Sequence, residues 1–258
     1  MYAVIKPLSL WGLAMALAGA AAPASAQSNY AQTGPKLVGT GATIPAGTLV
    51  RQGGAVALSA DGNTMIVGGA GDNADTGAAW VYVRANGAWV QQGDKLVGSF
   101  ASGAARQGVA VALSADGNTA IVGGYQDAGG LGAAWIFVRN GGAWSQQGVK
   151  LVGANAVGAA SQGISVALSA DGNTAVIGGS TDNGNNGAAW IFTRINAGWS
   201  PQGGKLVGTG NTGAARLGVS VALSADGNTA IAGGASDNAN VGAAWIFTRS
   251  RSEEHTSE

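Results

Sequence analysis

Several residue types that common enzyme sites require are missing from most of this chain. The 258 residues include no cysteine, so disulfide bonds and thiolate chemistry are excluded. The single histidine and all three glutamates lie in the last eight residues. The rest of the chain therefore has no Ser-His-Asp triad, no Cys-His pair and no zinc-protease helix. We expect no catalytic and no metal-binding residues of these kinds.

Charged residues are also scarce, at 10% of the chain, and the formal net charge is zero. The cations are spread evenly, whereas a nucleic-acid surface needs clusters of them to neutralise phosphates. Glycine is abundant instead, with 46 residues. It does not recur at every third position, which excludes a collagen helix. We expect no nucleic-acid partner, and the glycine content suits short strands joined by tight turns.

Residues 1–26 have the features of a secretory signal peptide. Lys6 supplies the positive charge, Leu8–Ala22 an apolar run, and Ala24–Ala26 a cleavage site of small residues. The apolar run is shorter than the roughly 20 residues that a membrane-spanning helix needs. We predict export with removal of this segment, no membrane insertion afterwards, and a short polar leader over residues 27–35.

One nine-residue stretch, Val-Ala-Leu-Ser-Ala-Asp-Gly-Asn-Thr, occurs four times at 55-residue intervals, first at Val56–Thr64. Each copy is preceded by Lys-Leu-Val-Gly and followed by a Gly-Gly pair, Gly-Ala-Ala-Trp and an arginine. The chain is thus an array of internal repeats. The four units span residues 36–94, 95–149, 150–204 and 205–250.

Each unit has room for four strands, as the second unit illustrates. Its strands are expected at Gly108–Ser114, Thr119–Gly123, Gly132–Arg139 and around Ala143–Gln147, from their alternation of large and small residues. The first two are joined by Ala115–Asn118, which contains the Asp-Gly pair of a tight hairpin. No window shows a sustained helical period with capping residues, so almost no helix is expected.

A four-stranded unit of this size cannot bury both faces of its sheet alone. Stacking the units around an axis solves the problem, and the result is a β-propeller, typically of 4–8 blades. A β-solenoid is the alternative, but its coils usually have shorter periods. We therefore predict an all-β fold, a β-propeller of repeated four-stranded blades.

The units resemble the FG-GAP repeat, which builds the β-propeller head of integrin α subunits and occurs in many bacterial secreted proteins. The resemblance is carried by Trp144–Leu151, Gly163–Ser169 and Gly187–Phe192, and it covers residues 36–250. It implies a non-enzymatic propeller that binds a protein or a glycan, located in the periplasm, on the surface or outside of a bacterium. Family propellers commonly have seven blades.

Two series of aspartates bear on calcium, which some blades of that family bind. Of the family's calcium loop only Asp61 and Gly62 remain in Ala57–Gly62, and calcium wants 6–8 oxygen ligands. We interpret Asp61 and its copies as turn residues, and expect no cofactor. The second series, which we expect to be solvated turn residues, is Asp72, Asp127, Asp182 and Asp237. The family's Phe-Gly is also replaced, by Gln52-Gly53, Gln107-Gly108, Gln162-Gly163 and Leu217-Gly218.

Seven tryptophans recur in the units, in two series. The series in the middle of the third strand should lie in the core between blades: Trp80, Trp135, Trp190 and Trp245. The series that follows a turn lies nearer an edge and supplies the candidate ligand contacts: Trp89, Trp144 and Trp199. Indoles of this second series could stack on sugar faces. The arginines Arg51, Arg106 and Arg216 are expected as loop-facing charges.

Arg251–Glu258 differs in composition from everything before it and resembles the translation of a sequencing adapter, so we exclude it from the fold. The fourth unit stops before the second tryptophan of the other units, and we expect these four units to belong to a larger ring.

Two other functions remain open at this stage. One is a glycan-cleaving propeller that uses paired carboxylates, for which Asp75 and Asp94 are the aspartates to inspect because they do not recur in the other units. The other is a scaffold within a longer secreted protein that has several domains.

Overall fold

The computed structural model describes residues 30–45 and 49–250. The predicted signal peptide and the excluded last eight residues lie outside this range. The chain divides into two compact units, Met1–Pro35 and Lys36–Glu258. In the described part of the first unit, residues 30–35 contain no helix or strand. The division at Lys36 coincides with the predicted start of the repeats.

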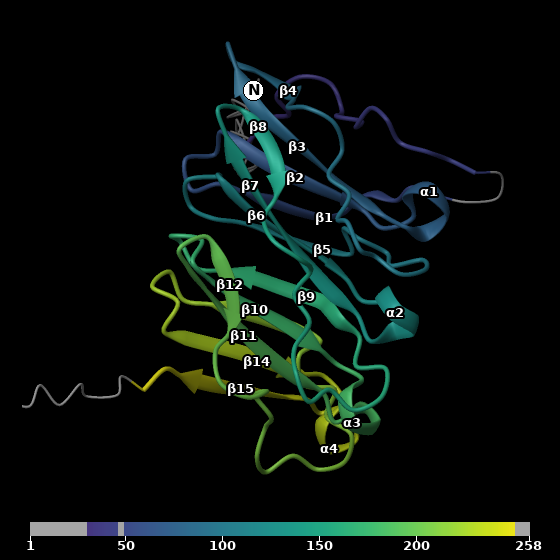
Figure 1. The fold of residues 1–258 in the computed structure, drawn as a ribbon, viewed down its shortest axis with the longest axis vertical. Helices are drawn as coiled ribbons and strands as arrows, with labels where there is room; N and C mark the ends of the chain where they lie inside the picture. Colours follow the sequence, from purple (N-terminus) through teal and green to yellow (C-terminus); the bar gives the residue numbers. More distant parts are fainter. Residues whose placement is uncertain (1–29, 46–48, 251–258) are drawn as a thin grey trace, which may run out of the picture. The chain divides into compact units, whose positions relative to one another are not determined.

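The second unit contains four antiparallel sheets, one for each repeat, which we call blades 1 to 4 (Figure 1). Blade 1 consists of β1 (Gln52–Leu58), β2 (Thr64–Gly69), β3 (Ala78–Ala85) and β4 (Ala88–Gln91). Blade 2 consists of β5 (Ala110–Leu113), β6 (Thr119–Gly124), β7 (Ala133–Asn140) and β8 (Ala143–Gln146). Blade 3 consists of β9 (Gln162–Leu168), β10 (Thr174–Gly179), β11 (Ala188–Ile195) and β12 (Gly198–Pro201). Blade 4 consists of β13 (Ser220–Leu223), β14 (Thr229–Gly234) and β15 (Ala243–Thr248).

Strands that follow one another in the sequence are neighbours in each sheet. The predicted strands of the second unit are found with shifts of one or two residues at their ends; β5 is the shortest relative to its prediction. The turn between β5 and β6 is the expected Asp-Gly turn, because Gly117 has φ +66° and its N–H donates to Ser114 O at 2.9 Å.

Each blade packs its face against the next blade in the chain. One core cluster joins Ile66 and Val81 of blade 1 to Val122 of blade 2. A second joins Ile136 of blade 2 to Ile177 of blade 3 in the same way. In blades 2 and 3, apolar residues point to both faces of the sheet because a neighbouring blade covers each face. The prediction of an all-β fold of stacked propeller blades is confirmed.

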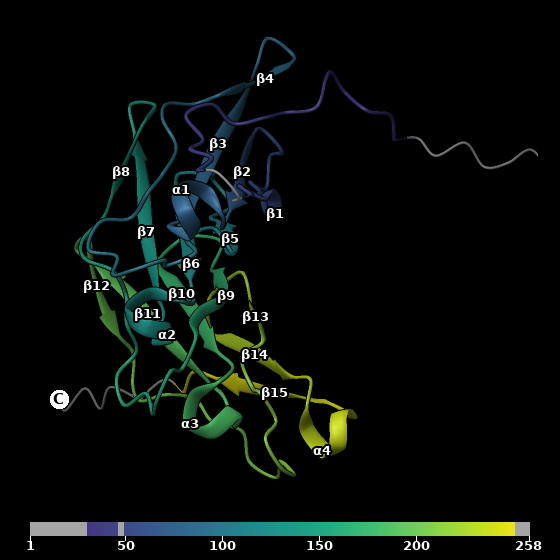
Figure 2. The ribbon, with the colours of Figure 1, turned by 90° about the vertical axis from the view of Figure 1, so that its right-hand side faces the viewer.

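The loops between the second and third strands contain short helical turns of four residues, α1 (Asp72–Asp75), α2 (Asp127–Gly130), α3 (Asp182–Asn185) and α4 (Asp237–Asn240). They follow one another along the blades, one to a loop (Figure 1, Figure 2). Each contains residues with left-handed backbone angles, such as Asn73 with φ 48° and ψ 61°. These turns are the only helices in the described residues, and none of them is long enough to cross a membrane.

The tryptophan in the third strand is held between two glycines of its own blade. In blade 2 a Cβ on Gly98 would lie 2.1 Å from Trp135 Cδ1, and one on Gly124 would lie 2.8 Å from Cζ3. The indole N–H donates to Ser99 O at 2.8 Å. Trp135 is fully buried, as are Trp80 and Trp190 to within 3%. This confirms the predicted core position of these three, whereas Trp245 of blade 4 is only half-buried. The packing also explains why two glycines recur with each tryptophan.

A buried glutamine that recurs in the repeats binds the backbone of one of these glycines. Gln107 Nε2 donates to Gly98 O at 3.0 Å, and Gly98 N–H donates to Gln107 Oε1. Gln162 binds Gly153 in the same way. Both glutamines are fully buried, so a paired amide compensates for burying a polar side chain there. The role of these two glutamines is therefore structural.

Candidate functional site

Two of the three tryptophans predicted to contact a ligand are engaged in holding blades together. Trp144 of blade 2 donates its indole N–H to Gln92 Oε1 of blade 1 at 3.0 Å. The guanidinium carbon of Arg139 lies 5.5 Å from the centroid of its ring, at cation–π distance. Trp199 of blade 3 repeats the arrangement with Gln147 and Arg194. Both indoles are half-buried.

The arginine beside each of these two tryptophans also forms hydrogen bonds to the preceding blade. Arg139 Nη1 donates to Gln92 Oε1 at 3.1 Å and to Thr64 Oγ1 at 3.2 Å, both on blade 1. Trp89 of blade 1 is half-buried and packs against the core of its own blade. Each of blades 1 to 3 thus carries one of the three candidate tryptophans. In Trp144 and Trp199 the indole N–H is hydrogen-bonded, and an arginine lies over one face of the ring.

The second aspartate series is not solvated, which corrects the prediction from the sequence. The side chain of Asp182 is fully buried and forms an ion pair with Lys205 Nζ at 2.6 Å. Its other oxygen accepts the N–H of Val157 at 2.7 Å. The same pair recurs between Asp72 and Lys95 and between Asp127 and Lys150. These carboxylates join the helical turn of one unit to the first lysine of the next.

The first aspartate series consists of turn residues, as predicted. Asp61 accepts hydrogen bonds from Ser59 Oγ and from Asn63, through both its backbone and side-chain N–H groups. These bonds, the one from Ser59 foremost, lower the pKa of Asp61 to about 2. At Asp116, burial raises the pKa, but hydrogen bonds from Ser114 and Asn118 outweigh it and the net shift is downward. Their oxygens are used within the turn. Residues 30–45 and 49–250 contain no cluster of three or more potential metal ligands of the His, Cys, Asp or Glu type.

A hollow of about 170 Å³ lies between blades 1 and 2, lined by Arg51, Arg106 and Tyr125 among others. We call it the rim hollow. Arg106 Nη1 donates to Tyr125 Oη at 2.9 Å, and its guanidinium carbon lies 5.9 Å from the centroid of that ring. Arg106 Nη2 also lies 3.6 Å from a carboxylate oxygen of Asp75. Its Nε is buried and has no hydrogen-bond partner among the described residues.

Sequence reasoning missed Tyr125, although a signal was present. The loop after the Gly-Gly pair varies between the repeats, and Tyr125 is the one aromatic residue in these four loops. The equivalent positions hold Ala70, Ser180 and Ala235. Arg106 was predicted as a loop-facing charge, and it lies in a loop at the rim hollow. Asp75 binds it, whereas Asp94 is exposed, and no described interaction joins the two aspartates.

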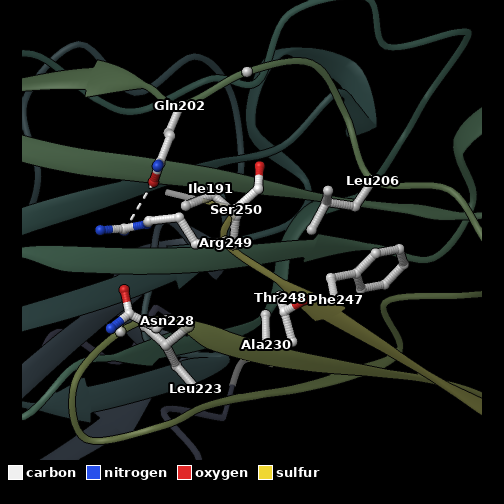
Figure 3. A pocket seen from close by; sticks show the side chains of 12 residues that line it. Ile191, Gln202, Leu206, Leu223, Asn228, Ala230, Phe247, Thr248, Arg249 and Ser250 are labelled. Carbon is white, nitrogen blue, oxygen red and sulfur yellow. Dashed lines mark hydrogen bonds between the residues drawn. The ribbon is translucent and has the colours of Figure 1, made fainter. Parts of the chain in front are cut away.

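A second cavity, of about 230 Å³, lies between blades 3 and 4 (Figure 3). Its wall includes the apolar side chains of Leu206 and Phe247. Gln202 and Arg249 meet at its edge, where Arg249 Nη2 donates to Gln202 Oε1 at 2.8 Å (Figure 3). We call this cavity the β15 pocket, because it adjoins that strand.

Comparison with known proteins does not identify a family for this chain. No protein-family model matches the chain, and no curated protein matches it. The chain forms four repeated small antiparallel sheets that are arranged like propeller blades.

Proposed function

We propose that this chain is an exported, non-enzymatic β-propeller of the FG-GAP type, and that it acts as a binding module for a glycan or protein in the periplasm, on the surface or outside of a bacterial cell. The repeated blades support the propeller, and the quoted repeat motifs support the family. Export rests on the features of the first 26 residues. Four nearly identical units disfavour a catalytic centre, because catalysis usually needs different residues in different roles.

The rim hollow is the site that we propose for the ligand. The units are nearly alike where blades pack, so a surface that is specific to this protein must come from residues that do not repeat. Tyr125 and Asp75 are two of these, and both contact Arg106. The single observation that carries the proposal is this aromatic and cationic group around a hollow. A ring for stacking and a guanidinium for a carboxylate fit an acidic glycan.

The test is binding of the purified chain to an array of oligosaccharides, neutral ones and ones that contain uronic acids. Binding to the acidic members is expected, with affinity about tenfold lower in Tyr125→Ala and in Arg106→Ala, since each loses a stacking or charge-assisted contact. The matched control is Arg216→Ala, the same repeat position in blade 4, where Ala235 replaces the tyrosine. Equal losses in the control, or binding that all variants retain, would place the ligand elsewhere.

A further inference from the structure

We propose that a cavity between blades 3 and 4, which we call the Gly208 pocket, binds a neutral ligand through a primary carboxamide group. The carboxamide oxygen accepts the N–H of Gly208, and the carboxamide nitrogen donates to Gly208 O. The cavity has a volume of about 310 Å³, the size of a small-molecule site. It shares no lining residue with the rim hollow, so the inference does not rest on what that hollow binds.

The first three units show which chemical group fits this position, because each fills it with a glutamine of its own. Gly153 N–H donates to Gln162 Oε1 at 2.5 Å, and Gln162 Nε2 donates to Gly153 O at 3.1 Å. One carboxamide thus satisfies both polar groups of one glycine. The same two bonds join Gln52 to Gly39, and Gln107 to Gly98.

In the fourth unit this carboxamide is missing. Leu217 stands at the position of the glutamine, and Gly208 stands at the position of Gly153. Gly208 is half-buried, and neither its N–H nor its C=O has a hydrogen-bond partner among the described residues. Buried peptide groups are normally paired. Because Gly208 and Leu217 both line the cavity, a ligand there can supply the missing carboxamide.

This difference follows from the identity of residue 217. In blade 3 the glutamine is the first residue of β9, the first strand of the blade, and in blade 4 Leu217 likewise precedes β13. The fourth strand of a blade does not supply this group in blades 1 to 3. The unpaired glycine is therefore a consequence of the leucine, whatever follows β15.

Other substitutions make the cavity more polar than the same place between blades 2 and 3. Leu131 and Ala156 pack against the core cluster there. Their counterparts Asn186 and Asn211 line the Gly208 pocket. The side-chain N–H groups of both asparagines donate to nearby backbone carbonyls, and their oxygens have no hydrogen bond among the described residues. The pocket thus offers further acceptors to a ligand that carries N–H groups.

The charges and the aromatic wall of the pocket favour a neutral, flat ligand. Asp182 and Lys205 are the charged residues of the lining, and they neutralise each other in an ion pair at 2.6 Å. Trp245 also lines the cavity and is half-buried, so a ring or a planar amide can pack on its indole.

Hydrogen-bond geometry selects a primary amide. A carboxylate has acceptors only, so one of its oxygens would face Gly208 O. A secondary amide in the trans form directs its N–H and C=O to opposite sides and cannot reach both groups of Gly208. The ligand class is therefore a primary carboxamide, either on a small aromatic molecule or on the glutamine side chain of a peptide.

The probes are benzamide, benzoate and N,N-dimethylbenzamide, which have similar shapes, titrated into the ¹⁵N-labelled full chain. Benzamide should shift the amide NMR signal of Gly208 and saturate. Benzoate and N,N-dimethylbenzamide should bind at least about tenfold more weakly, because each loses the bond to Gly208 O. Absence of binding by benzamide, or equal affinity of the three probes, would overturn the proposal.

A second pair of probes distinguishes the two sources of the carboxamide. These are the tripeptides Gly-Gln-Gly and Gly-Glu-Gly, both acetylated and with methyl ester ends, so that the glutamine carries the only primary amide. The glutamine peptide should bind more tightly than the glutamate peptide. A peptide source is indicated if it also binds more tightly than benzamide, and a small aromatic amide if it does not. Equal affinity of the two peptides would contradict recognition by the carboxamide.

Protein variants locate the site. Leu217→Gln should abolish the binding of benzamide, because the new side chain supplies the carboxamide to Gly208 as Gln162 does to Gly153. Leu217→Ile is the matched control, since it keeps the side-chain volume and adds no amide, and it should retain the affinity. Binding that persists in Leu217→Gln, or equal losses in both variants, would place the ligand elsewhere. The probe series uses the unaltered chain and tests the proposal even if a variant does not fold.

Discussion

At the scale of single residues, the buried ion pairs are the contacts most sensitive to substitution. Lys150→Met should lower the free energy of unfolding by about 3–5 kcal/mol, because it leaves the buried carboxylate of Asp127 without its counter-charge. Urea unfolding followed by circular dichroism measures this. Asp94→Asn, at an exposed aspartate, is the control and should change stability by less than about 0.5 kcal/mol. Equal, small effects would contradict the ion pair.

The turn aspartates predict a loss of stability in acid. The pKa of Asp61 and that of Asp226 are lowered from 3.8 to about 2 by hydrogen bonds that the folded turn supplies. Stability from a group with a lowered folded pKa is present above the unfolded value and is lost as the pH falls toward the folded one. The melting temperature should therefore fall between about pH 4 and pH 2. In Asp61→Asn the decline should be shallower, and an identical profile in that variant would contradict the assignment.

Residue-scale prediction from the sequence succeeded where the pattern is local. The Asp-Gly turn and the core tryptophan can be identified from their neighbours in the chain. The partners of Asp127 and Arg139 cannot, because they lie 23 residues away in one case and 47 and 75 in the other. Those separations are set by the repeat and the packing of blades. A buried aspartate and a solvated one look the same in a loop sequence.

At the scale of the element, the two glycines that contact each core tryptophan leave no room for a larger side chain at their positions. Gly98→Ala would place a Cβ 2.1 Å from Trp135 Cδ1, so the ring or the strand must move. We expect a loss of about 1–3 kcal/mol in unfolding free energy, typical of overpacking. Gly204→Ala is the control, since a Cβ there meets nothing within 4 Å. Chemical denaturation compares the two, and similar stabilities would contradict the packing of the tryptophan.

Strand positions were predictable because each blade alternates large and small residues, but the loops were less so. Helical turns such as α1 are too short to show a helical period of apolar residues. Of their left-handed residues, Asn73 and Ala74, the alanine is not of a type that predicts this backbone conformation. The rim hollow was missed for a related reason. Its residues come from loops of two blades, and only the fold brings Tyr125, Arg106 and Asp75 together.

At the scale of all four blades, the faces of blades 1 and 4 that point away from the other blades carry large apolar side chains that are exposed among the described residues. Val56 and Leu58 of blade 1 are 68% and 60% exposed, and Ile246 of blade 4 is 69% exposed. Their counterparts in blades 2 and 3 pack between sheets. Such faces favour self-association. Replacing both Leu58 and Ile246 by lysine should reduce the scattered light at high protein concentration, while Val149→Lys, 68% exposed in a loop, should not. Scattering that stays unchanged in the double variant would contradict this.

The central claim is that consecutive repeats pack as blades, and amide hydrogen exchange tests it most directly. The N–H groups of Ala60, Ala115 and Ala170 each donate to the carbonyl of the equivalent alanine in the next blade, at 2.8–2.9 Å. Ala225 has the same place in blade 4, and its N–H has no partner among the described residues. The account predicts slow exchange at the first three amides and fast exchange at Ala225. Equal, fast exchange at all four would contradict the packing of blade on blade.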